Sequence, residues 1–349
     1  MTYLLQYLLV GASTALLALV LTPIAGRIAG ALGIADAPGG RRRHSGIVPR
    51  LGGVPIFLAC VVIVVITMWT GDLTIGYSPG DYLRLRGLLT GGVLAFLFGL
   101  VDDRFELPAW PQFIFQFTLS LVALATTLWL ERFTLPGIGY VALDSYRWGA
   151  LLFVPLTVLW TMGMMNTVNW LDGLDGLAAG VGAIVCLVLA VHMHRVGQFS
   201  VALLPVALLG ALVGFLPYNV SPARVFLGSS GAFFLGYALS ALGLIAGGRI
   251  ATVLLVMGVP IVDVAWQIFD RVRHHRSPTQ GDRGHLHLRL LDAGISKRTI
   301  VLLYWGVCVL LGLVALFVAS RLCKLIALVA IIVAVVSVLA HLSRSDRSA

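Results

Sequence analysis

The chain contains 349 residues, of which 59% are hydrophobic and 11% are charged. Its mean hydropathy of +0.98 excludes a water-soluble domain, in which roughly 25% of residues are charged. The net charge of +9 fits anionic lipid headgroups, phosphate substrates and membrane topology better than nucleic acid. Long apolar runs without alternation exclude a transmembrane β-barrel. We therefore predict an all-α, polytopic membrane helix bundle that forms a single domain over residues 1–349.

Apolar runs divide the chain into about eleven predicted membrane helices, or about ten if one run does not cross the bilayer. The first run precedes the first basic residue, Arg27, and lacks the charged start of a signal peptide. We therefore expect it to be a retained membrane span. The predicted spans cover residues 4–24, 54–70, 86–101, 110–130, 149–165, 176–193, 201–216, 231–246, 249–269, 299–319 and 324–342.

Basic residues are distributed unevenly between the two sides of these spans. With the N-terminus outside, about sixteen of the 24 Lys and Arg residues fall on one side, which the positive-inside rule makes cytoplasmic. The C-terminal tail then also lies in the cytoplasm. The predicted cytoplasmic loops are residues 27–53, 102–109, 166–175, 217–230 and 270–298, and they contain nearly all of the unusual polar residues.

The first cytoplasmic loop is strongly cationic, because it contains Arg41–Arg43, His44 and Arg50. The positive-inside signal alone could account for this run of arginines. However, Gly39–Gly40 and Gly52–Gly53 flank the run, and glycine allows the backbone to approach a ligand closely. The loop is therefore a candidate for binding an anionic headgroup that enters from the bilayer.

Two adjacent carboxylates, Asp102 and Asp103, follow the third predicted span. Adjacent carboxylates repel each other, which raises their proton affinity unless a cation lies between them. A surface ion pair with the neighbouring Arg104 is one interpretation. The alternative is a pair that shares a metal ion or supplies a base.

A polar cluster lies between the fifth and sixth predicted spans and contains Asn166, Asn169, Asp172 and Asp175. The spacing of three would project all four side chains from roughly one side of a helix. Ionisable residues are costly at a membrane and usually mark a functional site. Amide and carboxylate oxygens suit Mg²⁺ and the phosphates that it carries. Capping of a helix end is the alternative, although capping needs only one such residue.

The loop after the seventh predicted span runs from Asn219 to Gly231 and ends in Gly-Ser229-Ser230-Gly just before an apolar run. A serine at a helix start caps free backbone N–H groups. The same helix terminus can bind phosphate, and the two roles are compatible. Phe226 could stack on a flat base, although packing is its commoner role.

The largest cytoplasmic loop contains His285 and His287, together with Arg283 and Arg289. Arginine makes bidentate contacts with phosphate, so this group is typical of phosphate recognition. The two histidines could also hold Zn²⁺, but no cysteine or third histidine is near them in the sequence.

These motifs together resemble the polyprenyl-phosphate N-acetylhexosamine-1-phosphate transferase superfamily, which is glycosyltransferase family 4. The resemblance extends from about residue 30 to residue 295. It rests on Asp36-Ala-Pro-Gly with Pro-Arg-Leu-Gly-Gly53, on Asp102-Asp103, on residues 166–177, on residues 219–231 and on His-Leu-His.

The resemblance implies transfer of a sugar 1-phosphate from a UDP-sugar to a polyprenyl phosphate such as undecaprenyl phosphate. UMP is released, and the reaction starts the synthesis of a cell-envelope polysaccharide. The cofactor would be Mg²⁺, with Mn²⁺ as a substitute, and the location would be the bacterial plasma (inner) membrane. The final span and the His-Leu-His form resemble the bacterial N-acetylglucosamine branch. Membrane lipids would be further partners, and the protein could also form a homodimer.

The resemblance also implies roles for individual residues, and Asp102 and Asp103 would be the catalytic pair. Asp175, Asn219 and Phe226 would lie near the uridine. The remaining matches are Asp172, His285 and His287 as further catalytic residues, Asp103, Asn169 and Asp172 as metal ligands, and Arg43, His44, Arg50, Arg283 and Arg289 as substrate-binding residues.

Two positions depart from the pattern of the family. Ser229 stands where the family usually has an Asp that resembles a Mg²⁺ ligand, and a hydroxyl is a weaker, neutral ligand. The family's His-x-His-His is here His285-Leu286-His287-Leu288. The first departure leaves catalytic competence open.

Four other functions would require different features of the sequence. The related phospho-N-acetylmuramoyl-pentapeptide transferases carry consecutive histidines in the last loop, which this chain lacks. A catalytically silent protein that binds a lipid or a nucleotide sugar would explain Ser229. A secondary transporter would have polar residues at the bilayer midplane and repeats, neither of which is evident. A CDP-alcohol phosphotransferase would need further Gly and Asp residues after Asp175.

Overall fold

The computed structural model describes residues 2–36, 47–69, 79–130, 132–135, 139–146, 148–245, 250–275, 277 and 284–348. The helices are α1 (Thr2–Leu32), α2 (Gly53–Trp69), α3 (Pro79–Phe105), α4 (Ala109–Ala125), α5 (Ala150–Leu171), α6 (Leu177–Arg195), α7 (Leu203–Asn219), α8 (Gly228–Ile245), α9 (Ile250–Val256), α10 (Gly258–Arg273), α11 (Leu286–Asp292), α12 (Lys297–Phe317) and α13 (Arg321–Ser348). Two short antiparallel hairpins, β1 (Ala35–Asp36) with β2 (Val48–Pro49) and β3 (Arg132–Leu135) with β4 (Gly139–Ala142), complete the elements.

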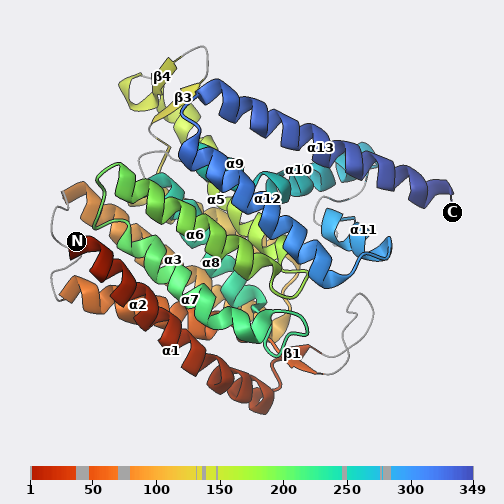
Figure 1. The fold of residues 1–349 in the computed structure, drawn as a ribbon, viewed down its shortest axis with the longest axis horizontal. Helices are drawn as coiled ribbons and strands as arrows, with labels where there is room; N and C mark the ends of the chain where they lie inside the picture. The colour runs from red at the N-terminus through yellow and green to blue at the C-terminus, as the bar shows by residue number, and fades with distance from the viewer. Residues whose placement is uncertain are drawn as a thin grey trace.

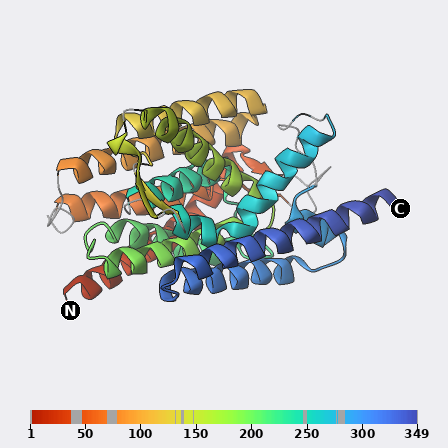
Figure 2. The same cartoon turned by 90° about the horizontal axis from the view of Figure 1, so that it is seen from above.

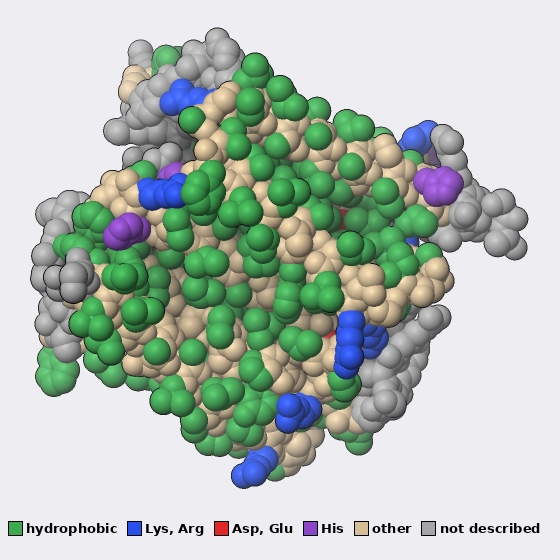
Figure 3. Space-filling view, in the orientation of Figure 1, with side chains coloured by type: hydrophobic (Ala, Val, Ile, Leu, Met, Phe, Trp, Pro, Cys, Tyr) green, Lys and Arg blue, Asp and Glu red, His purple; other side chains and the backbone are tan. Residues whose placement is uncertain are grey.

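Most of the long helices form one bundle and run in similar directions (Figure 1), whereas α10 runs obliquely to them (Figure 2). The N-terminus lies at one end of the bundle, and β1, α11 and the C-terminus lie at the other (Figure 1). Hydrophobic side chains cover most of the face drawn in Figure 3, and Lys and Arg lie mainly toward its edges. An apolar surface of this kind is stable only in lipid, so the prediction of an all-α membrane bundle is confirmed.

Helices occur at each of the predicted apolar runs. Seven helices in the described part of the chain are long and apolar enough to cross a membrane, and the bent pair α9–α10 makes an eighth. Three further apolar helices, α2, α4 and α7, are shorter, with 17 residues each. The count of about eleven spans stays a prediction, because the short helices cross the bilayer only if they are tilted little or the bilayer is thin around them.

The predicted span over residues 249–269 is not one helix. It breaks at Met257 into α9 and α10, whose axes differ by 82°. Pro260 explains the break, because it has no N–H to donate to the carbonyl of Val256 and its ring crowds that turn. The bend turns α10 obliquely away from α9, so that it packs against α5 and α13 and its Asp263 faces His285.

Helix α8 lies at the centre of the bundle, and all of its residues are buried. Its first turn is enclosed by glycines of the neighbouring helices. A Cβ on Gly99 of α3 would lie 2.4 Å from the Cα of Ser230, and one on Gly53 of α2 would lie 2.2 Å from the backbone N of Gly231. Small residues therefore let three backbones meet at this point.

The predicted loops are shorter than expected, because the helices run further into them. The structure confines the predicted loop 166–175 to residues 172–176, since α5 continues to Leu171 with no glycine or proline to stop it before Gly173. Helix α3 likewise continues to Phe105, so Asp102 and Asp103 lie in its last turn. The other three loops are shortened at their ends by α1, α7, α8, α10, α11 and α12.

Candidate functional site

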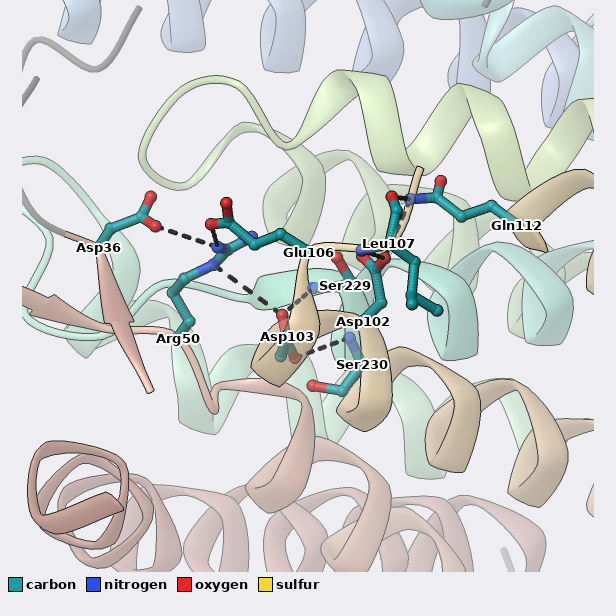
Figure 4. A network of polar contacts seen from close by, with 9 residues as sticks. All are labelled: Asp36, Arg50, Asp102, Asp103, Glu106, Leu107, Gln112, Ser229 and Ser230. Carbon is teal, nitrogen blue, oxygen red and sulfur yellow. Dashed lines mark hydrogen bonds and ion pairs between the residues drawn. The ribbon is translucent and has the colours of Figure 1, made fainter. Parts of the chain in front are cut away.

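The first turn of α8 is held by the carboxylate of Asp103 (Figure 4). The backbone N–H groups of Ser229 and Ser230 donate to the two carboxylate oxygens of Asp103, at 2.7 and 3.0 Å. A carboxylate is favourable here because the N-terminal end of a helix carries partial positive charge. Both oxygens of Asp103 are therefore engaged by backbone donors, and Asp103 occupies the helix terminus for which capping by serine and binding of phosphate were both considered.

Gly228 makes this arrangement sterically feasible. Its φ of +72° is costly for other residues, and an added Cβ would lie 2.1 Å from the carbonyl oxygen of Arg50 and 2.8 Å from the carboxylate oxygens of Asp103. A glycine is thus required at the first position of α8, because Arg50 and Asp103 approach it closely from two sides.

Arg50 links the first loop to the end of α3. Its guanidinium lies 3.1 Å from Asp36, 2.8 Å from Glu106 and 4.0 Å from Asp103 (Figure 4). Burial would lower the pKa of Arg50, but the three carboxylates around it raise the pKa above its ordinary value. Arg50 therefore neutralises part of a carboxylate cluster, and the cluster keeps a net negative charge.

Asp102 faces away from Asp103 and stabilises the turn between α3 and α4 (Figure 4). One of its carboxylate oxygens accepts hydrogen bonds from the backbone N–H of Leu107 at 3.1 Å and from the side chain of Gln112 at 3.0 Å. The side chains of the predicted pair therefore have separate partners, although both are buried.

Asp172 follows the last residue of α5 and lies within electrostatic reach of Asp103. Burial raises the pKa of Asp172 well above its ordinary value, and the charges of Asp103 and Asp175 add to this rise. Arg50 and a backbone hydrogen bond from Gly228 oppose the rise without cancelling it. The site would therefore gain from a cation or a proton close to Asp172.

The polar cluster between α5 and α6 does not form the single stripe that its spacing predicts. Asn166 donates to the side chain of Gln116 at 2.6 Å and to its own helix at the carbonyl of Met162. Asp175 lies beyond the helix, 3.4 Å from the backbone N of Ala223 and 3.9 Å from the Lys297 ammonium. The two ends of the cluster thus face different neighbours, because the helix stops between them.

Asn219 and Phe226 connect the loop before α8 to its neighbours. The side chain of Asn219 accepts from the backbone N–H of Gly176 at 3.1 Å and donates to the carbonyl of Val225 at 3.0 Å. The backbone of Phe226 pairs with Pro49 and Gly52, at 2.8 and 2.9 Å. These contacts join the turn at residue 176, the loop before α8 and the first cytoplasmic loop.

A second polar cluster contains both predicted histidines and one residue that the sequence analysis missed, Asp263 of α10. The Nδ1 atoms of His285 and His287 lie 3.2 and 3.9 Å from one carboxylate oxygen of Asp263. A Cβ on Gly173 would lie 2.6 Å from the Nε2 of His287. The histidines therefore meet the turn that carries Asp172. The signal for Asp263 was an acidic residue inside a predicted apolar span.

The remaining predicted residues differ in their positions. Asn169 is half-buried in the last turn of α5. Arg289 donates to the backbone carbonyl of Gly284 at 2.6 Å and to the hydroxyl of Ser343 at 2.5 Å, so it connects the histidine segment to α13. Three predicted substrate-binding residues lie outside the described residues, namely Arg43, His44 and Arg283.

The site fits Mg²⁺ by charge but holds no preformed cage. Across the ranges that the structure describes, no group of three or more His, Cys, Asp and Glu side chains could hold a metal ion. Mg²⁺ commonly needs only one or two carboxylates and takes its other ligands from water and substrate phosphates. The charges of Asp103 and Asp175 both raise the pKa of Asp172. This rise indicates an excess of negative charge that such an ion would balance.

The helix bundle and its cluster of buried carboxylates and histidines define an integral-membrane protein with an ionisable site at one end of the bundle. A model of glycosyl transferase family 4 matches residues 85–247. The chain is 32% identical to a probable undecaprenyl-phosphate N-acetylglucosaminyl 1-phosphate transferase of Bacillus subtilis, over 82% of this chain and 78% of the relative. It is 33% identical to a decaprenyl-phosphate N-acetylglucosaminephosphotransferase of Mycobacterium tuberculosis, over 90% of this chain and 82% of the relative.

The chain therefore belongs to glycosyl transferase family 4, in the branch of the polyprenyl-phosphate N-acetylglucosamine-1-phosphate transferases. A phospho-N-acetylmuramoyl-pentapeptide-transferase of Geobacillus kaustophilus is a more distant match, 30% identical over 81% of this chain and 87% of the relative. The family and the branch that the motifs predict are both confirmed.

Proposed function

We propose that the protein transfers N-acetylglucosamine 1-phosphate from a UDP-sugar to a polyprenyl phosphate and releases UMP. The observation that carries this proposal is an apolar groove of about 560 Å³ between α4, α5 and α10, which Asn166 and Trp170 line together with apolar side chains. The ring of Trp170 lies 5.4 Å from that of His285. A polyprenyl chain in this groove would therefore bring its phosphate to the histidine cluster and the turn at Asp172.

The reaction joins two anions, so the site must neutralise charge and align the reacting groups. An oxygen of the lipid phosphate attacks the β-phosphorus of the UDP-sugar, and the bond from that phosphorus to the UMP oxygen breaks. The second pKa of a phosphate is about 6, so the nucleophile is largely deprotonated near neutral pH. Asp102 then helps to position the nucleophile more than it acts as a base. This role suits its hydrogen bonds from Leu107 and Gln112, because they fix the orientation of its carboxylate.

We propose that Asp172, Asn169 and Asp103 bind Mg²⁺, or Mn²⁺ in its place. When bound, the ion would neutralise the diphosphate and stabilise the charge that develops on the leaving UMP. Ser229 presents a hydroxyl where a further carboxylate is expected, and its backbone N–H is already bonded to Asp103. The phosphates and water would supply the other ligands.

We further propose that the site faces the cytoplasm of a bacterial plasma membrane, where UDP-sugars are available. This proposal is supported by contacts that bring together described residues at or next to all five predicted cytoplasmic loops, namely those of Arg50, Asp103, Asp172, Asn219 and His287. Association into a homodimer stays a prediction.

Two alternatives make different predictions. A muramyl-pentapeptide substrate is disfavoured by the more distant match and by the absence of consecutive histidines, since Leu288 follows His287. A catalytically silent binding protein is favoured by Ser229 alone.

A radiolabelled transfer assay separates these functions. Membranes that contain the protein are incubated with undecaprenyl phosphate, Mg²⁺ and a panel of UDP-sugars, with the UDP-muramyl-pentapeptide included. We expect labelled lipid and UMP with UDP-N-acetylglucosamine. Labelling with the pentapeptide alone would support the first alternative, and binding of a UDP-sugar without transfer would support the second.

A further inference from the structure

Helix α10 carries a stripe of buried polar residues. Asp263, Gln267 and Arg271 are spaced by four, so they lie on one face of the helix. Their exposed fractions are 3%, 1% and 3%. Polar side chains are costly to bury unless they are hydrogen-bonded, so each of the three residues must have a partner inside the protein.

The partners lie on the histidine segment and on the end of α5. Gln267 donates to the backbone carbonyl of Gly284, the residue before His285. The Arg271 guanidinium lies over the ring of Trp170, 5.6 Å from its centre. The bend after α9 thus places the polar face of α10 against the segment that enters the candidate site.

Asp263 makes the most specific contacts of the stripe. One carboxylate oxygen accepts from the backbone N–H of Leu286 at 2.9 Å. The other lies 3.2 Å from the Nδ1 of His285 and 3.9 Å from the Nδ1 of His287. The backbone contact fixes the orientation of the carboxylate, so the second oxygen is presented to the two imidazoles.

A carboxylate beside Nδ1 determines which nitrogen of a neutral histidine carries the proton. Because the oxygen of Asp263 accepts, His285 keeps its proton on Nδ1 and leaves Nε2 to act toward a ligand. The Nδ1 of His287 lies 3.9 Å from the same oxygen, beyond hydrogen-bond distance. Its Nε2 lies on the side of Gly173 where a Cβ would be. The hydrogen bonds of Asp263 among the described residues go to His285 and to the backbone of Leu286. Any effect of Asp263 on the turn that carries Asp172 is therefore transmitted through the histidines.

We propose that Asp263 is a positioning residue for the transfer reaction, which orients the histidine segment and sets the tautomer of His285 at the diphosphate site. This inference rests on the proposed function for the reaction, but the tautomer can be measured without it. The groups that face Asp263 are His285 and His287 on the α11 side, and Tyr304 of α12. The Tyr304 hydroxyl is buried and has no hydrogen-bond partner among the residues that the structure describes.

The test compares Asp263→Asn and Asp263→Glu with Asp270→Asn. Asp270 is the matched control, because it lies on the same helix and contacts a histidine, His274 at 3.4 Å, but at a more exposed position. In Asp263→Asn the Leu286 N–H retains the amide oxygen, so the amide NH₂ faces Nδ1 of His285 and removes its acceptor. Asp263→Glu retains a carboxylate.

Two measurements are made on the full-length protein in detergent. The first is the ¹⁵N spectrum of protein labelled only at histidine, with the His285 signals assigned from His285→Gln. We expect Nδ1–H in the unchanged protein and in Asp270→Asn, and Nε2–H in Asp263→Asn. The second is the transfer of N-acetylglucosamine 1-phosphate per folded molecule. We expect kcat to fall about 10- to 100-fold in Asp263→Asn with a small change in KM, and partial recovery in Asp263→Glu.

An unchanged tautomer in Asp263→Asn would overturn the proposal, as would an unchanged kcat in a protein that transfers the sugar phosphate. An equal loss of kcat in Asp270→Asn would also overturn it. Absence of transfer by the unchanged protein would instead refute the proposed function, and a tautomer change in the same sample would still support the positioning role of Asp263.

Discussion

Asp103 and Asp263 are both buried carboxylates that accept backbone N–H groups near the start of a helix, yet they differ in what else they contact. Asp103 accepts from two successive N–H groups of α8 and has Arg50 as its nearest cation. Asp263 accepts from one N–H, and its second oxygen faces His285 and His287. The first carboxylate builds the site, whereas the second acts on groups that can exchange protons with a ligand.

The comparison also explains why the two residues differ in how visible they are in the sequence. Asp103 stands beside Asp102 at the end of an apolar run, where a pair of carboxylates is conspicuous. Asp263 is a single acidic residue within an apolar run, and its partner His285 is 22 residues away. Sequence spacing predicts neighbours on one helix, but it does not predict which helix packs against a distant loop.

Substitution of Asp172 or Asp102 by Asn should have the largest effect on activity. We expect UMP release to fall by about 100-fold or more in Asp172→Asn, because the charge that would balance a cation is lost. We expect a comparable loss in Asp102→Asn, because the amide oxygen can still accept from Leu107 and Gln112 but the negative charge at the end of α3 is lost. UMP release is measured with folded protein in detergent, and full activity in either variant would remove that residue from the site.

Gly228→Ala should have the largest effect on stability. The new Cβ would meet the Arg50 carbonyl and the Asp103 carboxylate, at a φ of +72° that alanine rarely adopts. We expect a loss of about 1–3 kcal/mol in the free energy of unfolding and a larger fractional loss of activity than in Asp263→Glu.

The matched control for this variant is Gly306→Ala in α12, where a Cβ would meet nothing within 4 Å. Thermal unfolding of both variants, followed by circular dichroism in detergent, makes the comparison. Equal melting temperatures in the two variants would contradict the close approach at the start of α8.

Ser229→Asp tests whether the α8 terminus is a weakened metal site. A third carboxylate beside Asp103 and Asp172 would increase the negative charge of the cluster. We expect half-maximal activity at a lower Mg²⁺ concentration, by a factor of about 5 to 10 if the new charge contributes about 1 kcal/mol. The Mg²⁺ dependence of transfer is the measurement, and Ser296→Asp at the start of α12 is the control. An unchanged dependence would place metal binding elsewhere.

The smallest expected effect is a pH-dependent change in the melting temperature of Asp172→Asn. The raised pKa of Asp172 means that ionisation of this group disfavours the folded state. This penalty is absent when both states are protonated, appears as pH rises above about 3.9 and is complete above the folded-state pKa. Asp172→Asn removes the penalty, so its melting temperature should exceed that of the unchanged protein at neutral pH.

The difference in melting temperature should then shrink as the pH falls toward 4, because the unchanged protein becomes protonated at Asp172. Each kcal/mol corresponds to at most about 2–4 °C, which is the range for smaller chains of roughly 150–250 residues. A difference that does not vary with pH would show that Asp172 carries no unfavourable charge in the folded state.

Much of the fold could be predicted from the apolar runs, because a bilayer requires helices of a known length and hydropathy. The break at Met257 could not, since the effect of Pro260 depends on whether neighbouring helices support a kink. The helical continuation of α5 to Leu171 was also missed, because Asn166 is stabilised there by Gln116, 50 residues earlier in the chain. The motif residues Asp103, Asp172, Ser229 and His287 lie in one region of the structure. The separate partners of Asp102 could not be predicted, because they depend on tertiary contacts.

The most direct test of the central claim measures transfer by the purified, full-length protein. Labelled UDP-N-acetylglucosamine, undecaprenyl phosphate and Mg²⁺ are supplied, and lipid-linked sugar phosphate and UMP are quantified, with Asp172→Asn as the blank. We expect equal amounts of the two products from the unchanged protein and neither from the variant. Tight binding of the UDP-sugar without either product, at any Mg²⁺ concentration, would contradict the assignment of this site to sugar-phosphate transfer.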